Sequence, residues 1–337
     1  MFVVIVWKVS IVFMKNFWEK LKQQKKPFFC LAPMAEVTDM VFRQMVIKFG
    51  KPDVVFTEMV ACDGLCSLGK ERLLEILKFS EKERPIVAQV FGACPENFYQ
   101  TALLVKQLGF DGIDINMGCP QKNILKQGAG ADLINHPALA KKIIQATKAG
   151  AGELPVSVKT RIGFNQDEIE VWLPILLAEQ PAVITLHGRT KKALSKISAD
   201  WGIIKRGVEI AKGSGVLIVG NGDVQDILDG RQKAQDSGVD GVMIGRAVLK
   251  RPWLFNNLDV GRPSEGFPSK KERLKMLEEH LKLFEKIYQR KGEKNFALMK
   301  KHIKNYLVDF KGAKELRLKL MECEEVKEVE KILQPLL

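Results

Sequence analysis

The sequence predicts an α/β protein, a (β/α)8 TIM barrel followed by a small all-helical C-terminal domain. Eight short apolar runs rich in Val and Ile recur along the chain, as is typical of parallel strands buried on both faces. A helical pattern follows each run, and successive runs begin 25 to 43 residues apart, a plausible length for one βα unit. Beyond Trp253 only helical periodicity continues.

The expected strands are, in chain order, 28–34, 53–59, 85–91, 111–116, 154–160, 181–187, 215–221 and 240–245. Helix signals lie between them: Asp39 can cap a helix, and Pro95 and Pro137 suit first helical turns. A doubly wound open sheet is the competing architecture. It usually has fewer strands and a glycine-rich turn after the first, whereas here the first strand ends in Ala32-Pro33-Met34.

These patterns divide the 337-residue chain into four parts. They are an N-terminal extension at 1–27, apolar and then Lys-rich, a catalytic barrel at 28–257, a linker at 258–268 and a helical domain at 269–337. Glycines and prolines between 261 and 268 mark the linker.

The first fourteen residues are almost entirely apolar. They are fewer than the ~20 needed to span a bilayer, and they lack the basic leading segment and cleavage site of a signal peptide. Three interpretations are open: a true start at Met14, a loosely attached tail, or an interfacial anchor. We favour the first two and expect removal of residues 1–13 to leave activity intact.

Charge suggests the kind of partner. Lys and Arg exceed Asp and Glu by 53 to 40, a net charge of +13 that favours polyanions such as nucleic acid or anionic lipid. Residues 270–319 carry 16 Lys or Arg against 7 Asp or Glu. The ordinary interpretation of such runs is solvated helix faces. The alternative is a surface for a phosphate backbone, with Lys300, Lys301, Lys304 and Lys311 as candidates.

The six cysteines form no C-x-x-C pair and no disulfide framework, so free thiols in a reducing cytosol are expected. No H-E-x-x-H motif or acidic cluster predicts a metal site.

Polar residues stand at nearly every expected strand end, where a (β/α)8 barrel places its chemistry. Gly222 and Gly245, with Arg246 beside the latter, follow strands seven and eight, a recurrent place for a phosphate. Cys119 follows strand four, and a thiol with a pKa near ~8.5 can donate a proton as well as attack. Lys159 lies inside strand five, where a buried ammonium needs a partner.

Six segments together resemble the tRNA-dihydrouridine synthase family, and they occur in that family's order over roughly residues 28 to 255. They are Leu31-Ala32-Pro33-Met34-Ala35, Asp114-Ile115-Asn116-Met117-Gly118-Cys119-Pro120, Val158-Lys159-Thr160-Arg161, His187-Gly188-Arg189-Thr190, Asn221-Gly222-Asp223 and Gly245-Arg246. The segment around Cys119 is the most diagnostic, and the helical tail also looks like that family's C-terminal domain.

The resemblance implies an FMN- and NADPH-dependent reduction of specific uridines in tRNA to 5,6-dihydrouridine. Hydride would pass from reduced FMN to C6, and Cys119 would supply the proton to C5. Asn116 and Arg161 would contact the uracil. The residues implied for FMN binding are Pro33, Met34, Ala35, Gln89, Lys159, His187, Asn221, Gly222, Asp223, Gly245 and Arg246. The helical domain would bind tRNA, and the enzyme would be cytoplasmic, with no stable membrane association and no obligate protein partner.

The sequence departs from the family pattern in two places: Glu36 stands where glycine is common, and the loop 191–199 lacks a glycine often found there. Two other functions stay open. One is an FMN-dependent barrel oxidoreductase acting on a small molecule such as a free pyrimidine. The other is a non-catalytic tRNA-binding protein, against which Cys119, Lys159 and His187 argue.

Overall fold

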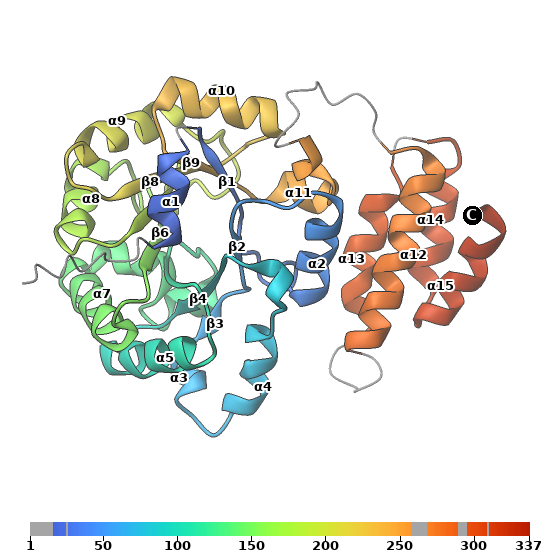
Figure 1. The fold of residues 1–337 in the computed structure, drawn as a ribbon, viewed down its shortest axis with the longest axis horizontal. Coiled ribbons are helices and arrows are strands. Elements are labelled where there is room, and N and C mark those ends of the chain that lie inside the picture. Colours follow the sequence, from blue (N-terminus) through green and yellow to red (C-terminus); the bar gives the residue numbers. More distant parts are fainter. Residues whose placement is uncertain (1–15, 25, 258–267, 289–294, 309) are drawn as a thin grey trace, which may run out of the picture.

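A computed structural model describes residues 16–24, 26–257, 268–288, 295–308 and 310–337. The apolar segment 1–14 and almost all of the expected linker lie outside these residues. The described chain folds as the predicted barrel with a helical bundle beside it (Figure 1).

The barrel has eight strand positions, because β2 and β3 share one position and both pair with β4. The described strands pair in parallel, in the order β1-β9-β8-β7-β6-β5-β4-β2. Where β1 meets the segment before β2, the Leu31 amide donates to the Val54 carbonyl at 3.0 Å. The strands are β1 (Phe28–Leu31), β2 (Val55–Phe56), β3 (Val60–Ala61), β4 (Ile86–Phe91), β5 (Gly112–Met117), β6 (Val156–Arg161), β7 (Val183–His187), β8 (Leu217–Asn221) and β9 (Gly241–Ile244). The predicted fold class is confirmed.

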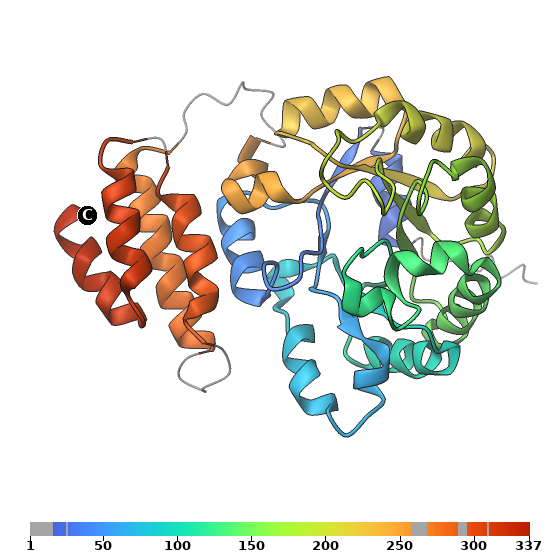
Figure 2. The same ribbon diagram turned by 180° about the vertical axis from the view of Figure 1, so that it is seen from behind.

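Helices follow the strands and cover the outside of the barrel (Figure 2). Asp39 caps the first of them through a 3.0 Å bond from the Phe42 amide, as the sequence predicted. The barrel helices are α2 (Met40–Phe49), α3 (Cys62–Leu65), α4 (Lys70–Leu74), α5 (Pro95–Gln107), α6 (Lys122–Leu125), α7 (Pro137–Ala151), α8 (Ile169–Ala178), α9 (Trp201–Ala211), α10 (Ile227–Ser237) and α11 (Arg246–Lys250).

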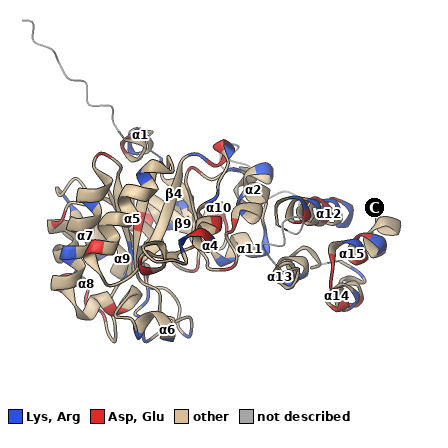
Figure 3. Cartoon of the chain, turned by 90° about the horizontal axis from the view of Figure 1, so that it is seen from below, with Lys and Arg blue, Asp and Glu red and all other residues tan. Residues whose placement is uncertain are grey.

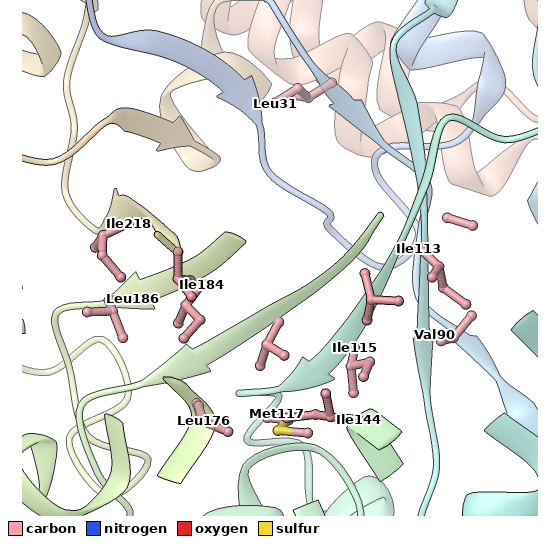
Figure 4. Close-up of a cluster of buried hydrophobic side chains, with 14 of the residues drawn as sticks. Leu31, Val90, Ile113, Ile115, Met117, Ile144, Leu176, Ile184, Leu186 and Ile218 are labelled. Atoms are coloured by element: carbon pink, nitrogen blue, oxygen red, sulfur yellow. The ribbon is translucent and has the colours of Figure 1, made fainter. Parts of the chain in front are cut away.

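The main core lies between the strands and these helices. Ile113, Ile115 and Met117 of β5 are fully buried there, in one cluster with Ile144 of α7 and Leu176 of α8 (Figure 4). The alternate residues of β5, Gly112, Asp114 and Asn116, lie on its inner face and are buried as well, so that face is polar although no part of the strand meets solvent.

The inside of the barrel forms a second cluster, and the N-terminal helix α1 (Phe17–Gln23) belongs to it. Trp18 of α1 is 1% exposed and packs against Phe28 and Phe56, with ring centroids 5.6 and 6.4 Å apart. Figure 1 shows α1 across one end of the barrel. Residues 17–23, predicted as part of the extension, therefore pack with the barrel. Burying the large indole of Trp18 removes apolar surface of both the ring and the barrel interior from water.

The C-terminal helices form a bundle with its own core. They are α12 (Lys270–Ile287), α13 (Ala297–Tyr306), α14 (Ala313–Glu322) and α15 (Val326–Leu333). Both signs of charge occur on their surfaces (Figure 3). The bundle packs on α2. The rings of Phe42 and His302 stack with their centroids 4.9 Å apart, and Lys48 Nζ lies 2.6 Å from Glu279 Oε2.

Among the described helices, none combines the length and the apolar character needed to cross a membrane.

Candidate active site

A cavity of about 1170 Å³ opens at the carboxyl ends of the strands. Its walls come from the carboxyl-terminal parts of β6, β7, β8 and β9 and from the segments that follow β1, β5, β7, β8 and β9. Ten of the residues predicted for the site line it: Pro33, Met34, Lys159, Arg161, His187, Asn221, Gly222, Asp223, Gly245 and Arg246. These residues converge because the strands are parallel, so that all their carboxyl ends lie on the same side of the barrel.

Asp223 organises two guanidinium groups at one side of the cavity. Its Oδ1 accepts from Arg246 Nη2 at 2.7 Å, and its Oδ2 accepts from Arg189 Nη2 and from the Ala199 amide. Burial alone would raise the pKa of Asp223, but the hydrogen bonds from Arg189 and Ala199 lower it on balance, so the carboxylate is charged. Arg246 is thereby oriented while 63% of its side chain stays exposed.

Gly222 follows β8 with a φ of +125°. A Cβ at this position would lie 2.5 Å from the Cβ of Ala199 and 3.0 Å from the His187 ring. Only glycine fits this turn beside the cavity, because both the backbone angle and the close approach exclude a side chain.

Lys159 and His187 face the cavity from neighbouring strands, β6 and β7. Lys159 Nζ lies 3.3 Å from Asn221 Oδ1. Desolvation in the barrel and, after it, the charge of Arg161 together lower the pKa of Lys159 to about 8. Desolvation and the nearby Lys159 also hold the pKa of His187 well below its usual value, so its ring is neutral. His187 Nε2 lies 3.3 Å from Arg189 Nη1; because a guanidinium only donates, Nε2 accepts and Nδ1 carries the proton.

A polar relay runs beneath the cavity from β6 to the loop that holds Cys119. Asp114 accepts from Ser157 Oγ at 2.6 Å and from Gln89 Nε2 at 2.7 Å. Gln89 Oε1 then accepts from Asn116 Nδ2 at 2.9 Å. Asn116 Oδ1 is thereby turned toward the loop, where it accepts from the amides of Gly118 at 3.1 Å and of Cys119 at 2.8 Å.

The direction of this relay is set at Asp114. A carboxylate only accepts, so it orients the Gln89 amide, which in turn orients Asn116. Burial raises the pKa of Asp114 to about 6, and the bonds from Gln89 and Ser157 oppose that rise.

Cys119 is half-buried beside the cavity, and its neighbour Pro120 lines the wall. Burial raises the pKa of its thiol, which is therefore protonated at neutral pH. Arg161 Nε donates to the Gly118 carbonyl at 2.6 Å, and Arg161 Nη1 donates to the Thr190 carbonyl at 3.2 Å. Arg161 thus ties the Cys119 loop to the loop after β7.

Four predicted residues lie outside the cavity wall. Gln89 and Asn116 are 1% and 8% exposed in the relay beneath it, Cys119 lies beside it, and Ala35 is exposed on the loop after β1. The relay supports the Cys119 loop, a role that the sequence reasoning did not assign.

Arg189 and Asp114 were missed as site residues although both lie within the quoted motifs. Arg189 is 4% exposed and joins His187, Asp223 and the Ile197 carbonyl. The signal that could have found both is charge at a strand end or on the inner face, where a charged group needs partners.

Glu36 does not face the cavity. Its side chain is 75% exposed, and its φ is +57°, the left-handed region that glycine adopts most easily. Within the described residues no group of three or more His, Cys, Asp and Glu is placed to hold a metal ion.

The dihydrouridine synthase family model matches residues 30–337, so the chain belongs to that family of enzymes. It is 40% identical over 323 residues to the probable tRNA-dihydrouridine synthase of Staphylococcus aureus (strain COL), with 95% of each chain covered. It is 41% identical over 325 residues to the probable tRNA-dihydrouridine synthase 2 of Bacillus subtilis (strain 168), covering 95% of this chain and 96% of the relative. The predicted family is confirmed.

Solved structures share the barrel. One is a complex of 2-naphthoyl-CoA reductase with 2-naphthoyl-CoA, at 11% identity and a TM-score of 0.52, covering 70% of this chain and 50% of that one. Another is histamine dehydrogenase from Rhizobium sp. 4-9, at 12% identity and a TM-score of 0.51, covering 76% and 49%. These likenesses concern the fold alone.

Proposed function

We propose that this enzyme reduces uridine in tRNA to 5,6-dihydrouridine with FMN as cofactor and NADPH as reductant. Membership of the dihydrouridine synthase family supports the reaction and the tRNA substrate. The observation that carries the residue assignment is the Cys119 loop, which the buried relay and Arg161 hold at the edge of a cavity containing Lys159 and His187.

The cavity residues fit FMN. Arg246 and the backbone at Gly222 and Gly245 suit a phosphate monoester, since oriented N–H groups and a guanidinium bind its oxygens. Asp223 binds the arginines, so its part in holding the phosphate is to position Arg246. Lys159, whose Nζ donates to Asn221 Oδ1 at 3.3 Å beside the cavity, suits the pyrimidine edge of the ring system, where negative charge develops on reduction. Pro33, Met34, Ala35, Gln89, His187 and Asn221 complete the proposed flavin-binding set.

When bound, FMN that NADPH has reduced supplies the hydride for C6 of the uracil. Cys119 Sγ is the proposed donor of the proton to C5, and the raised pKa of the thiol keeps that proton in place until it is needed. Asn116 and Arg161 are proposed to face the uracil; their bonds to Gly118 and Cys119 also fix where Sγ stands.

The target uridine must leave its stack to reach this cavity, as is general for enzymes that modify a base. The helical domain beside the barrel is the proposed site for the rest of the tRNA, read by shape and phosphate contacts. A cytoplasmic location without an obligate protein partner completes the proposal.

The test is the dihydrouridine content of unmodified tRNA, measured by mass spectrometry after incubation with the flavin-loaded protein and NADPH. We expect new dihydrouridine with the wild type, and with Cys119→Ala a loss of about 100-fold or more in rate at unchanged flavin content. Cys119→Ser is the matched control for side-chain size, and a hydroxyl of much higher pKa should recover little activity.

Two outcomes would overturn the proposal. A flavin-loaded protein that oxidises NADPH and reduces a free pyrimidine, but leaves tRNA unchanged, would identify a small-molecule oxidoreductase. Full activity of Cys119→Ala would remove Cys119 from the reaction.

A further inference from the structure

One lysine of the helical domain is bonded to the loop that follows the first barrel strand. Lys301 Nζ of α13 donates to the Glu36 carbonyl at 2.6 Å and lies 3.2 Å from Glu36 Oε2. The side chain of Lys301 is 24% exposed, so the contact is partly shielded from water. The two residues are 265 positions apart and come from the bundle and the barrel.

The segment to which Lys301 is bonded, residues 32–38, also lines the cavity. Residues 32–38 run from the end of β1 past Pro33 and Met34, which lie in the cavity wall. Inside this segment the amides of Val37 and Thr38 each donate to the Met34 carbonyl at 3.0 Å, and the Glu36 amide donates to Glu58 Oε1 at the end of the second strand position. Glu36 is therefore held from two sides, by Glu58 of the barrel and by Lys301 of the bundle.

The same helix also contacts a second, neighbouring part of the cavity wall. α13 contacts α11, the helix that begins at Arg246. The stacking of His302 on Phe42 holds α13 on the barrel. Met299 and Ile303 hold it in the bundle, since both are buried in the bundle core. A shift of α13 would thus move both the 32–38 segment and α11.

We infer that Lys301 is a positioning residue: it couples the helical domain to residues 32–38, so that binding of tRNA on the bundle sets the cavity wall around Pro33 and Met34. This inference rests on the proposed function. It also revises the sequence-based suggestion that Lys301 is a phosphate contact, because its ammonium already binds Glu36, whereas Lys304 and Lys311 are exposed.

The direct test is hydrogen exchange of the amides at residues 34–38 in the full-length protein, without flavin or tRNA. We expect Lys301→Met to speed this exchange by about 10-fold, because it removes two bonds that restrain the segment. Lys301→Arg keeps a cationic donor and should restore most of the protection. Lys314 is an exposed lysine of α14, so Lys314→Met removes the same charge from the same bundle and should leave the segment as in the wild type.

The kinetic test uses the same variants with FMN, NADPH and tRNA. A positioning role predicts that Lys301→Met lowers kcat for tRNA reduction by about 10-fold with less than a threefold change in the Kd for tRNA. A phosphate contact predicts the opposite, a weaker and less salt-dependent Kd at unchanged kcat. Melting temperatures of all variants identify any that fail to fold.

Unchanged exchange at 34–38 in Lys301→Met, with the effect confined to the tRNA Kd, would overturn the inference. A wild type that makes no dihydrouridine would instead refute the proposed function, and the exchange experiment on the flavin-free protein would still decide whether Lys301 restrains the segment.

Discussion

The relay from Asp114 to Cys119 makes a specific prediction about Asn116→Asp, a change of nearly constant shape. In the native protein Asn116 Nδ2 donates to Gln89 Oε1 at 2.9 Å. A carboxylate at this position has no hydrogen to donate, so one of its oxygens would face the Gln89 carbonyl. The Gln89 amide cannot turn to relieve this contact, because its Nε2 would then leave Asp114.

The cost follows from the burial of these groups. Gln89 and Asp114 are 1% and 0% exposed and Asn116 is 8% exposed, so water does not replace the lost bond. An unsatisfied buried acceptor costs about 1–3 kcal/mol and an added buried charge costs more, which predicts a loss of about 2–4 kcal/mol in the free energy of unfolding at pH 8.

The loss should depend on pH. The folded protein disfavours the charged form of the new carboxyl, so its pKa is raised above the unfolded value of about 4. The destabilisation is therefore complete above the folded pKa, and it fades as pH falls through that pKa, because the protonated group can again donate to Gln89.

Urea denaturation of the wild type, Asn116→Asp and Asn116→Ala at pH 8 and pH 5 provides the assay. We expect the deficit of Asn116→Asp relative to wild type to shrink at pH 5, while that of Asn116→Ala stays nearly constant. Equal deficits of Asn116→Asp at both pH values, or no deficit at pH 8, would refute the amide orientation described above.

Two further predictions concern Lys159 and the N-terminal helix. Because the pKa of Lys159 is about 8, only about a quarter of this amine is protonated at pH 8.5. If Lys159 becomes fully protonated when FMN binds, binding should take up as much as about 0.75 proton, measured by titration calorimetry in two buffers of different ionisation enthalpy. Lys159→Met should abolish the uptake, and equal heats in both buffers for the wild type would contradict the role. Trp18→Ala should lower the free energy of unfolding by about 3–5 kcal/mol, because it opens the floor of the barrel. Deletion of residues 1–13, which spares α1, should leave both the melting temperature and activity unchanged, and a folded but inactive deletion variant would show that the segment matters.

Much of the site was predictable because its signals are local. Cys119, Lys159, His187 and the Gly222 turn each stand at or near a strand end, and the recurring βα pattern fixes where strand ends meet. The relay was not predictable from spacing alone. Gln89, Asp114 and Ser157 come from three successive strands, and which of their atoms pair depends on the register of β4, β5 and β6.

The partners of individual charged side chains also could not be predicted from the sequence. Lys301 has the same sequence character as the exposed lysines around it, yet it binds Glu36, 265 positions away. The apolar and Lys-rich start of the chain likewise gave no sign that Trp18 would cover one end of the barrel, since a helix of seven residues is too short for a clear periodicity.

Periodicity, turn residues and strand-end motifs are properties of neighbours along the chain, and they were enough to predict the barrel, the trailing helices and the family. Three features became visible only in the folded chain: how the bundle docks on α2, how the amides of Gln89 and Asn116 are oriented beneath Cys119, and that Lys301 binds the loop after β1. These depend on contacts between distant segments, whose free energies are settled by packing and desolvation.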